Sequence, residues 1–263
     1  MDVPVTRRGT VIEDYHGTLV ADPYRWLEEA GSEETQAWSE AQNAVTRAYL
    51  DAIPALERLK ARFTELWDYP KYSAPRKEGG HYYFSKNTGL QNQSVLYRRA
   101  GLQGESQLVL DPNTLSEDGT VALTNLAVSK SGALLAYSTS ASGSDRQEIK
   151  VRHVDSGREY GEMIKWVKFT NIAWRHDNRG FYYSRFPEPG SVAEEDENNF
   201  RRVYWHEAGT PQEKDQLVYE RPEEKELGFD PIITHDGQYL LLNVWHGTDP
   251  KNRFYYREVA SNG

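Results

Sequence analysis

The side chains of this sequence that could carry out chemistry are its seven histidines and the serines that follow glycines. A serine nucleophile on an α/β sheet needs the pattern Gly-x-Ser-x-Gly, placed on a turn between a strand and a helix. The Gly-Ser pairs that start at Gly143 and Gly190 lack the glycines of that pattern. No histidine stands in a His-Glu-x-x-His pair, which would bind a zinc ion. The sequence therefore predicts no catalytic residue and no metal site in this chain.

Patterns built on glycine or on acidic residues also predict no cofactor. The sequence has no Walker loop and no Gly-x-Gly-x-x-Gly, the two patterns in which the backbone approaches a phosphate closely. The acidic run Glu194–Glu197 lacks the EF-hand pattern with its glycine at the sixth position. We interpret this run as a solvent-exposed loop.

The elements that would position any site are clearest in residues 126–157. Ser131-Gly132 is a turn pair, because glycine adopts positive φ without strain. After it, the apolar run Ala133–Tyr137 predicts a buried strand, and residues 140–145 form a polar loop. Apolar residues then alternate with charged ones from Ile149 to His153, as in a strand with one wet face. Short strands joined by tight turns predict an antiparallel sheet.

A glycine turn followed by an aromatic or apolar run occurs four times in the chain. The four glycines are Gly80, Gly132, Gly180 and Gly237, spaced by 52, 48 and 57 residues. A period near 50 residues with four short strands per unit is typical of β-propeller blades. The alternative is a β-sandwich, in which strand spacing is shorter and less regular. The predicted fold is therefore mainly β, a partial propeller of about four blades with the last one incomplete.

Polar segments of these repeats can be interpreted structurally. His176-Asp177 and His235-Asp236 stand just before the turn in two repeats, which favours a structural turn over a catalytic pair. The loops at 87–94 and 140–145 would lie at one end of the blades or line the central channel. Each favours a turn over a binding site.

The first 71 residues follow a different pattern. Residues 1–31 predict an extended arm with a break at Asp22-Pro23, and Ser32 is a candidate N-cap for a helix with glutamates in its first turn. Pro54 is suited to the first turn of a second helix. Each helix has an apolar face that needs a partner. The face consists of Ala37, Trp38, Ala41, Ala44, Val45, Ala48 and Tyr49 in the first helix, and of Leu56, Leu59, Phe63, Leu66 and Trp67 in the second. We expect one domain at 1–71 and a second at 72–263.

The composition of the chain indicates which kinds of partner and which cellular compartment to expect. The net charge of −9, with basic residues interspersed among acidic ones, does not predict a nucleic-acid partner. The absence of cysteine excludes disulfides and suits a reducing compartment. No apolar run approaches the roughly 20 residues of a membrane helix, and the N-terminus lacks the apolar core of a signal peptide. We expect a cytoplasmic protein that binds neither nucleic acid nor membrane.

Ten short motifs follow one another along the whole chain. They are Asp14–Gly17, Asp22–Glu28, Ala41–Asn43, Tyr69–Tyr72, Asn87–Ser94, Leu110–Thr120, Ser142–Asp145, Lys168-Phe169, Ala173-Trp174 and residues 249–253. In this order they resemble the N-terminal part of the prolyl oligopeptidase family of serine peptidases. One departure is Arg146, where the family usually has tryptophan after Ser-Gly-Ser-Asp.

The resemblance implies a seven-bladed propeller that gates the active site of an α/β-hydrolase domain, on which the N-terminal segment packs. In the family the catalytic triad lies in the C-terminal hydrolase domain, which this sequence does not contain, so this chain alone is expected to be inactive. The whole enzyme would be a monomer that cleaves short peptides after proline. Asp145 and Arg253 occupy motif positions consistent with substrate steering; an inter-blade ion pair or a solvated charge is the alternative for each. The chain ends at Asn262-Gly263, a hairpin-turn pair without a returning strand, as a truncated chain would.

Two other functions stay open at this level. One is a basic-residue-specific oligopeptidase of the same superfamily, which shares the motif at 22–28, although the loop at 87–94 favours the prolyl branch. The other is a free-standing propeller that binds a protein partner. An incomplete ring weighs against this second function, because it leaves open strand edges.

Overall fold

The computed structural model describes residues 3–259, so the predicted turn at Asn262-Gly263 lies outside the described residues. The chain divides into two compact units, with the boundary between Asp68 and Tyr69. No helix in the described part of the chain is long and apolar enough to span a membrane.

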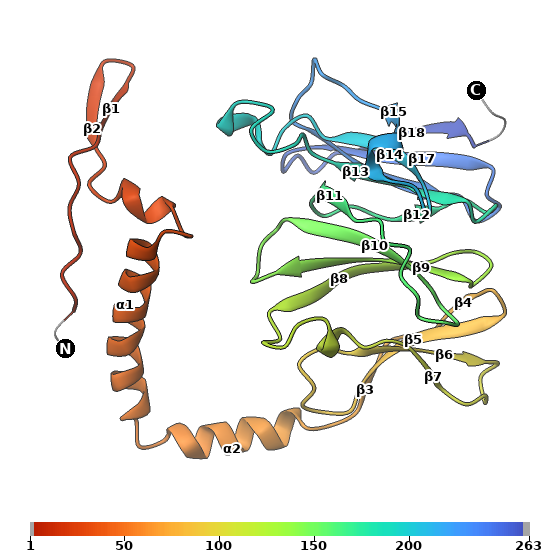
Figure 1. The fold of residues 1–263 in the computed structure, drawn as a ribbon, viewed down its shortest axis with the longest axis horizontal. Helices are drawn as coiled ribbons and strands as arrows, with labels where there is room; N and C mark the ends of the chain where they lie inside the picture. The colour runs from red at the N-terminus through yellow and green to blue at the C-terminus, as the bar shows by residue number, and fades with distance from the viewer. Residues whose placement is uncertain (1–2, 260–263) are drawn as a thin grey trace. The chain divides into compact units, whose positions relative to one another are not determined.

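The first unit begins with a hairpin that the sequence did not predict (Figure 1). Strands β1 (Ile12–Tyr15) and β2 (Thr18–Ala21) pair antiparallel, and Tyr15 faces Thr18 across the turn. The two turn residues, His16 and Gly17, have φ values of 54° and 88°, which is the geometry of a type I′ turn. The expected extended arm is therefore wrong over this segment, because the turn brings its two halves together.

The helices of the first unit largely follow the sequence prediction. Helix α1 (Glu33–Asp51) is N-capped by Ser32, whose hydroxyl accepts a hydrogen bond from the Thr35 amide at 3.2 Å. Helix α2 is Leu56–Trp67 and ends before Asp68, as predicted. Pro54 is not in its first turn: it lies in the turn before the helix, where the Leu56 amide donates to the Ile53 carbonyl. A 3-10 helix, η1 (Arg25–Glu28), precedes α1.

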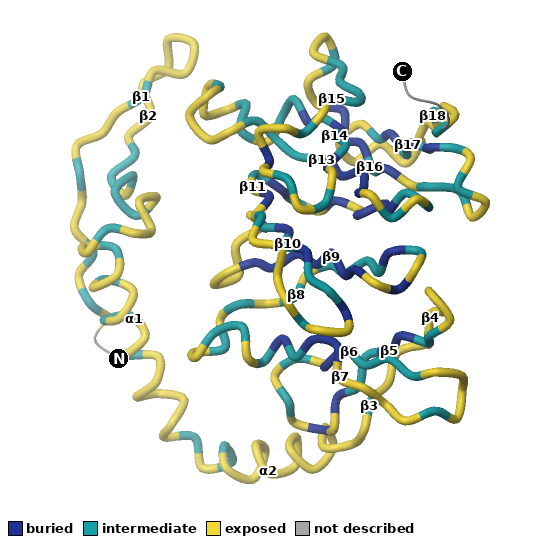
Figure 2. Tube along the Cα trace, turned by 45° about the vertical axis from the view of Figure 1, so that its right-hand side comes forward, coloured by how far each residue is buried: buried dark blue, intermediate teal, exposed yellow. Residues whose placement is uncertain are grey.

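The described residues of the first unit include none that is buried. On α2, the apolar face predicted from the sequence is largely exposed, with Phe63 67% and Leu66 51% exposed. The trace of this unit is coloured as exposed or intermediate throughout (Figure 2). These helices therefore have no hydrophobic core of their own.

The second unit consists of four antiparallel sheets, called blades 1 to 4 here. Blade 1 contains β3 (Lys71–Tyr72), β4 (Arg76–Glu78), β5 (His81–Asn87), β6 (Val95–Ala100) and β7 (Gln107–Leu110). Blade 2 contains β8 (Val121–Val128), β9 (Leu134–Ala141), β10 (Gln147–His153) and β11 (Ile164–Val167). Blade 3 contains β12 (Ala173–Trp174), β13 (Gly180–Arg185), β14 (Arg202–Glu207) and β15 (Gln216–Tyr219). Blade 4 contains β16 (Leu227–Ile233), β17 (Tyr239–His246) and β18 (Arg253–Glu258).

The strand order confirms the predicted repeat. Strands follow one another in chain order within blades 2 to 4, and in blade 1 the order is β3-β5-β6-β7 with β4 also paired to β5. The four repeat glycines occupy equivalent places: each precedes or begins one strand of its blade, namely β5, β9, β13 or β17. Blade 4 has three strands within the described residues, and the sheets do not close into one ring. Short 3-10 helices, η2 (Pro112–Thr114), η3 (Glu194–Asp196) and η4 (Gln212–Lys214), lie in the connections.

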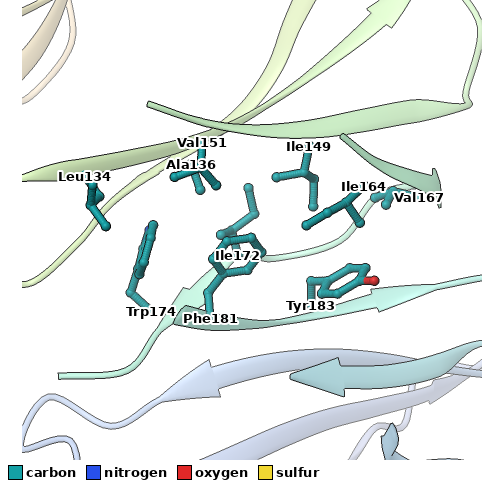
Figure 3. Close-up of a cluster of buried hydrophobic side chains, with 10 residues drawn as sticks. All are labelled: Leu134, Ala136, Ile149, Val151, Ile164, Val167, Ile172, Trp174, Phe181 and Tyr183. Carbon is teal, nitrogen blue, oxygen red and sulfur yellow. The ribbon is translucent and has the colours of Figure 1, made fainter. Parts of the chain in front are cut away.

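The hydrophobic cores lie between neighbouring blades. Residues of blade 2 such as Ile149 and Val151 pack against Trp174, Phe181 and Tyr183 of blade 3 (Figure 3). Two similar clusters join blade 1 to blade 2 and blade 3 to blade 4. Strand β9 is buried on both faces because it has a blade on each side, and it extends through Ala141, so the predicted loop at 140–145 begins two residues later.

The His-Asp pairs form structural turns, as predicted. The carboxylate of Asp177 accepts a hydrogen bond from the Arg179 amide at 3.1 Å, and that of Asp236 accepts from the Gln238 amide at 3.0 Å. Gly237 follows with a φ of 77°, and a Cβ at this glycine would lie 2.4 Å from the His176 ring. This turn of blade 4 therefore packs closely on the equivalent turn of blade 3.

Candidate functional site

One loop from each blade contributes to one end of the second unit. These are the β5–β6, β9–β10, β13–β14 and β17–β18 loops. They comprise residues 88–94, 142–146, 186–201 and 247–252. The loop of blade 2 and the insertion of blade 3 lie together at the left-hand end of their sheets in Figure 1. This end, called the loop end below, contains both residues that the sequence singled out for substrate steering.

Asp145 and Arg253 lie in different blades, with blade 3 between them. Asp145 is exposed in the β9–β10 loop. Arg253 is the first residue of β18, and its guanidinium lies 3.6 Å from a carboxylate oxygen of Glu224. Tyr255 and Glu224 raise the pKa of Arg253 above its ordinary value. The two charges therefore do not form one site together; each faces the loop end from its own blade.

The loop of blade 1 is held by its own amide groups. The side chain of Asn87 donates to the Gln91 carbonyl at 2.9 Å, and the Gln91 side chain accepts from the Thr88 amide at 2.8 Å. Gln93 reaches blade 2, where its side chain donates to the Val121 carbonyl and accepts from the Leu123 amide, both at 2.8 Å. These amides shape the loop and join two blades, in agreement with its interpretation as a turn.

The acidic insertion of blade 3 corrects the sequence interpretation. Glu194 and Glu195 are exposed, as a solvated loop would be, but the next two acids are half-buried and paired. Asp196 lies 2.7 Å from the Lys225 ammonium, and Glu197 lies 2.8 Å from the Arg146 guanidinium. Hydrogen bonds from Lys225 and Asn199 lower the pKa of Asp196. The insertion is therefore tied to blade 4 on one side and to the blade 2 loop on the other.

A pocket of about 440 Å³ lies between that insertion and blade 2. Its walls include Arg146 from the loop, Lys150 from β10, Lys165 and Trp166 from β11, and Phe186 from the insertion. A second pocket, of about 530 Å³, is lined mainly by β4, β8, β12 and β16, the strands that stand first or near the start of each blade. The sequence alone reveals neither pocket, because each is built from segments far apart in the chain.

A buried polar cluster joins blades 2 and 3 outside these pockets. His206 is fully buried, with Nδ1 2.7 Å from Asp215 and Nε2 3.8 Å from Glu162, whose side chains are 1% and 3% exposed. The Tyr183 hydroxyl donates to Asp215 at 2.6 Å. Burial alone would lower the pKa of His206, but its contacts with Asp215 and Glu162 outweigh burial and raise it. Burial also raises the pKa of Tyr183, which keeps its hydroxyl protonated.

Within the described residues, no group of three or more histidine and acidic side chains is arranged to hold a metal ion. In this cluster the imidazole bonds to a carboxylate, which in turn accepts from a phenol. The arrangement links strands β13 and β14 to the connections before β11 and β15. Because the cluster lies between blades 2 and 3, we interpret it as a structural contact that holds the two blades together.

The chain matches the family model described as "Prolyl oligopeptidase, N-terminal beta-propeller domain" over residues 4–263. It is 38% identical to a prolyl endopeptidase from Elizabethkingia meningoseptica, over 98% of the chain and 36% of that relative. It is also 38% identical to prolyl oligopeptidase A from Galerina marginata, over 95% of the chain and 38% of that relative. The chain thus spans little more than a third of the length of these curated relatives.

Solved structures of prolyl oligopeptidases also match nearly the whole of this chain, over less than half of their own length. A structure from a mechanistic study of two prolyl endopeptidases has a TM-score of 0.87 and 33% identity, over 99% of this chain and 38% of that one. Prolyl oligopeptidase B from Galerina marginata, bound to a 35mer hydrolysis and macrocyclization substrate, has a TM-score of 0.82 and 31% identity. That match covers all of this chain and 40% of the other.

Proposed function

Because this chain belongs to the prolyl oligopeptidase family, we propose that it is the N-terminal part of a serine-type oligopeptidase that cleaves short peptides after proline. In this proposal the blades gate the active site and steer the substrate, while a C-terminal α/β-hydrolase domain supplies the catalytic residues. The observation that carries the proposal is the match over residues 4–263 to the propeller domain of this family, on a chain that folds as four blades.

The first unit supports a docking role on that hydrolase domain. Its helix α2 presents Leu59, Phe63 and Leu66 to solvent, and a helix with such an apolar face is stabilised mainly by packing it against a partner. We assign residues 1–71 to the part that accompanies the hydrolase domain and residues 72–263 to the blades. Strand β3 (Lys71–Tyr72) pairs with β5, so the connection between the two parts leads directly into blade 1.

Asp145 and Arg253 are the proposed steering residues. Asp145 is exposed at the loop end, and Arg253 has a 57% exposed side chain although Glu224 lies nearby. Charges placed along a path of this kind attract or repel a charged substrate before it reaches the catalytic groups. The expected effect is a change in substrate preference and not a loss of chemistry.

A chimera tests this function. The chain would replace the matched N-terminal part of the prolyl endopeptidase from Elizabethkingia meningoseptica, and cleavage of short proline-containing peptides and of a folded protein would be compared. We expect cleavage of the peptides only. Asp145→Asn should change kcat/KM by about three- to tenfold between peptides with positively and negatively charged N-termini. Glu105→Gln, a change of an exposed acid in the β6–β7 connection at the opposite end of blade 1, is the matched control. Equal kinetics of Asp145→Asn and the parent across the series would remove Asp145 from the steering path.

The isolated chain gives a second test. Acyl transfer by a serine peptidase requires a serine activated by histidine and donors for the oxyanion. The purified 263-residue chain should therefore release no product from a post-proline reporter peptide. Cleavage that copurifies with the chain through successive chromatography steps would contradict the assignment of catalysis to the missing domain.

A further inference from the structure

The pocket between blade 2 and the insertion of blade 3 is lined by more cationic than anionic side chains, on a chain whose net charge is −9. Four cationic side chains line it, against two carboxylates, Glu148 and Glu197. Arg146 is paired with Glu197, and Lys168 donates to the Asn198 side chain at 2.5 Å. Among the described residues, Lys150 and Lys165 have no ion pair and no side-chain hydrogen bond. The pocket thus keeps two ammonium groups available for a ligand.

The apolar wall of the pocket is held in an unusual conformation. Trp166 has a φ of 63°, and it lies where the β10–β11 register shifts between Gln147 and Ile149. A bulge of this kind turns a side chain away from the regular alternation of a strand, and bulges are frequent next to active sites. The Trp166 carbonyl accepts from the Phe186 amide at 2.9 Å, and the Arg185 guanidinium lies 5.1 Å from the centre of the Trp166 ring. These contacts fix the indole at the edge of the pocket.

Strained residues are concentrated in this region. Besides Trp166, the non-glycine residues Ser142, Phe169 and Phe200 have positive φ, and all four belong to the loop end of blades 2 and 3 or to the segment beside it. A bulky residue with positive φ costs free energy, and such residues gather where a ligand is held. The strain, the free ammonium groups and the pocket are three separate observations at the same place.

Arg146 adds to the positive charge of the pocket lining. Its guanidinium holds Glu197, which would otherwise place an uncompensated negative charge at the pocket. With arginine here, the local balance shifts toward binding anions.

We propose that this pocket is a subsite for an acidic side chain of a bound peptide. The carboxylate would lie between the Lys150 and Lys165 ammonium groups, and the adjacent peptide carbons would contact Trp166, Phe186 and Pro187. A volume of about 440 Å³ exceeds what a small free anion fills, and the aromatic and proline surfaces suit a peptide chain. The inference rests on the proposed function, in which peptides reach the loop end, and it adds a preference for acidic substrates.

Calorimetric titration of the full chain with two peptides tests the proposal. The probes are acetylated and amidated Ala-Glu-Ala-Pro-Ala and its counterpart with glutamine in place of glutamate. At about 20 mM salt the glutamate peptide should bind roughly fivefold more tightly, and at about 500 mM salt the two should bind alike, because salt screens exposed charges. The salt dependence of the parent chain keeps the test valid even if a variant folds poorly.

Substitutions of the pocket residues test whether the preference for the glutamate peptide arises in this pocket. Lys150→Gln with Lys165→Gln should reduce the preference to less than about twofold, and Lys214→Gln, an exposed lysine outside the pocket, should leave it unchanged. Arg146→Trp should weaken the preference because Glu197 loses its partner. Equal binding of both peptides at low salt would overturn this inference and leave the proposed function standing. A preference that survives the lysine double variant would also overturn it. No binding of either peptide would overturn it too, whereas the proposed function is decided by cleavage in the chimera.

Discussion

The two units of this chain use similar residue types in different ways. The described residues of the helical unit carry large apolar side chains on α1 and α2, yet none of them is buried. The blades bury tyrosine, phenylalanine and leucine residues almost completely, including Tyr137, Phe181 and Leu135. Both units therefore contain enough apolar surface for a core, but only the blades contain a second surface to pack it against.

This contrast follows from how each unit is built. A blade has two faces, and the next blade in the chain covers one of them, so each added repeat completes the core of its neighbour. Two helices in succession have no such repeated partner. Their stability depends on packing an amphipathic face, since isolated helices of this length are marginal in water. The helical unit is thus the part of the chain that most needs a partner.

The largest expected difference comes from matched phenylalanine substitutions in the two units. Phe181 is fully buried, and its ring packs edge-on against the rings of Trp174 and Tyr183. The distances between ring centres are 5.1 Å and 6.1 Å. Phe181→Ala should lower the free energy of unfolding by about 3–5 kcal/mol, because it leaves a cavity between blades 2 and 3. Phe63→Ala, at a residue 67% exposed on α2, should change it by less than about 0.5 kcal/mol. Urea unfolding followed by tryptophan fluorescence measures both.

The same pair of variants can break the comparison. Equal losses for Phe181→Ala and Phe63→Ala would show that α2 is covered in solution and that the helical unit has a core after all. A small loss for Phe181→Ala alone would show that the junction between blades 2 and 3 is loosely packed.

A second prediction concerns the pH dependence of the blade junction. The contacts of His206 with Asp215 and Glu162 raise its pKa in the folded chain. A raised histidine pKa stabilises the fold fully below the ordinary value of about 6.5, and this contribution is lost as the pH rises through the folded value. Between those two values, stability should fall by about 1.4 kcal/mol per pH unit for the one proton. Unfolding free energies measured at a series of pH values from about 6 upward test this.

His206→Gln is the control for that measurement. The variant cannot titrate, so its stability should lack this decline, although its absolute stability falls because buried partners lose a hydrogen bond. The same slope in the variant, or a stability of the parent that rises over this interval, would assign the pH dependence to other groups.

The sequence predicts most of the blade architecture because the repeat is local. Each repeat glycine is followed within a few residues by the strand it introduces, so turn chemistry and alternation suffice. Ser32 is identified as an N-cap for the same reason, since capping involves only the next three residues. Propeller membership, the arm motifs and the family all follow from patterns that are contiguous in the chain.

Contacts between distant segments are what the sequence did not reveal. Arg146 and Glu197 are 51 residues apart, and Glu162 reaches His206 from another blade, so no local pattern announces either pair. The β1–β2 hairpin was missed for a local reason: its turn is His16-Gly17, and histidine is a less common residue in the left-handed conformation than asparagine or aspartate. The steering roles of Asp145 and Arg253 stay predictions, because their positions alone do not reveal what passes them.

The smallest expected effect sharpens the comparison from the helical side. Ser32 caps α1 by accepting the Thr35 amide, and Ser32→Ala should cost that helix about 1 kcal/mol. The circular dichroism signal of helix should therefore fall, while Ser32→Asp, which can cap in the same way, should preserve it. The urea midpoint of the blades, read from their buried tryptophan, should not move, because no core residue of the blades belongs to this unit. If Ser32→Ala shifted that midpoint together with the helix signal, the two units would unfold as one, and the contrast between cored blades and a helical unit without a core would be wrong.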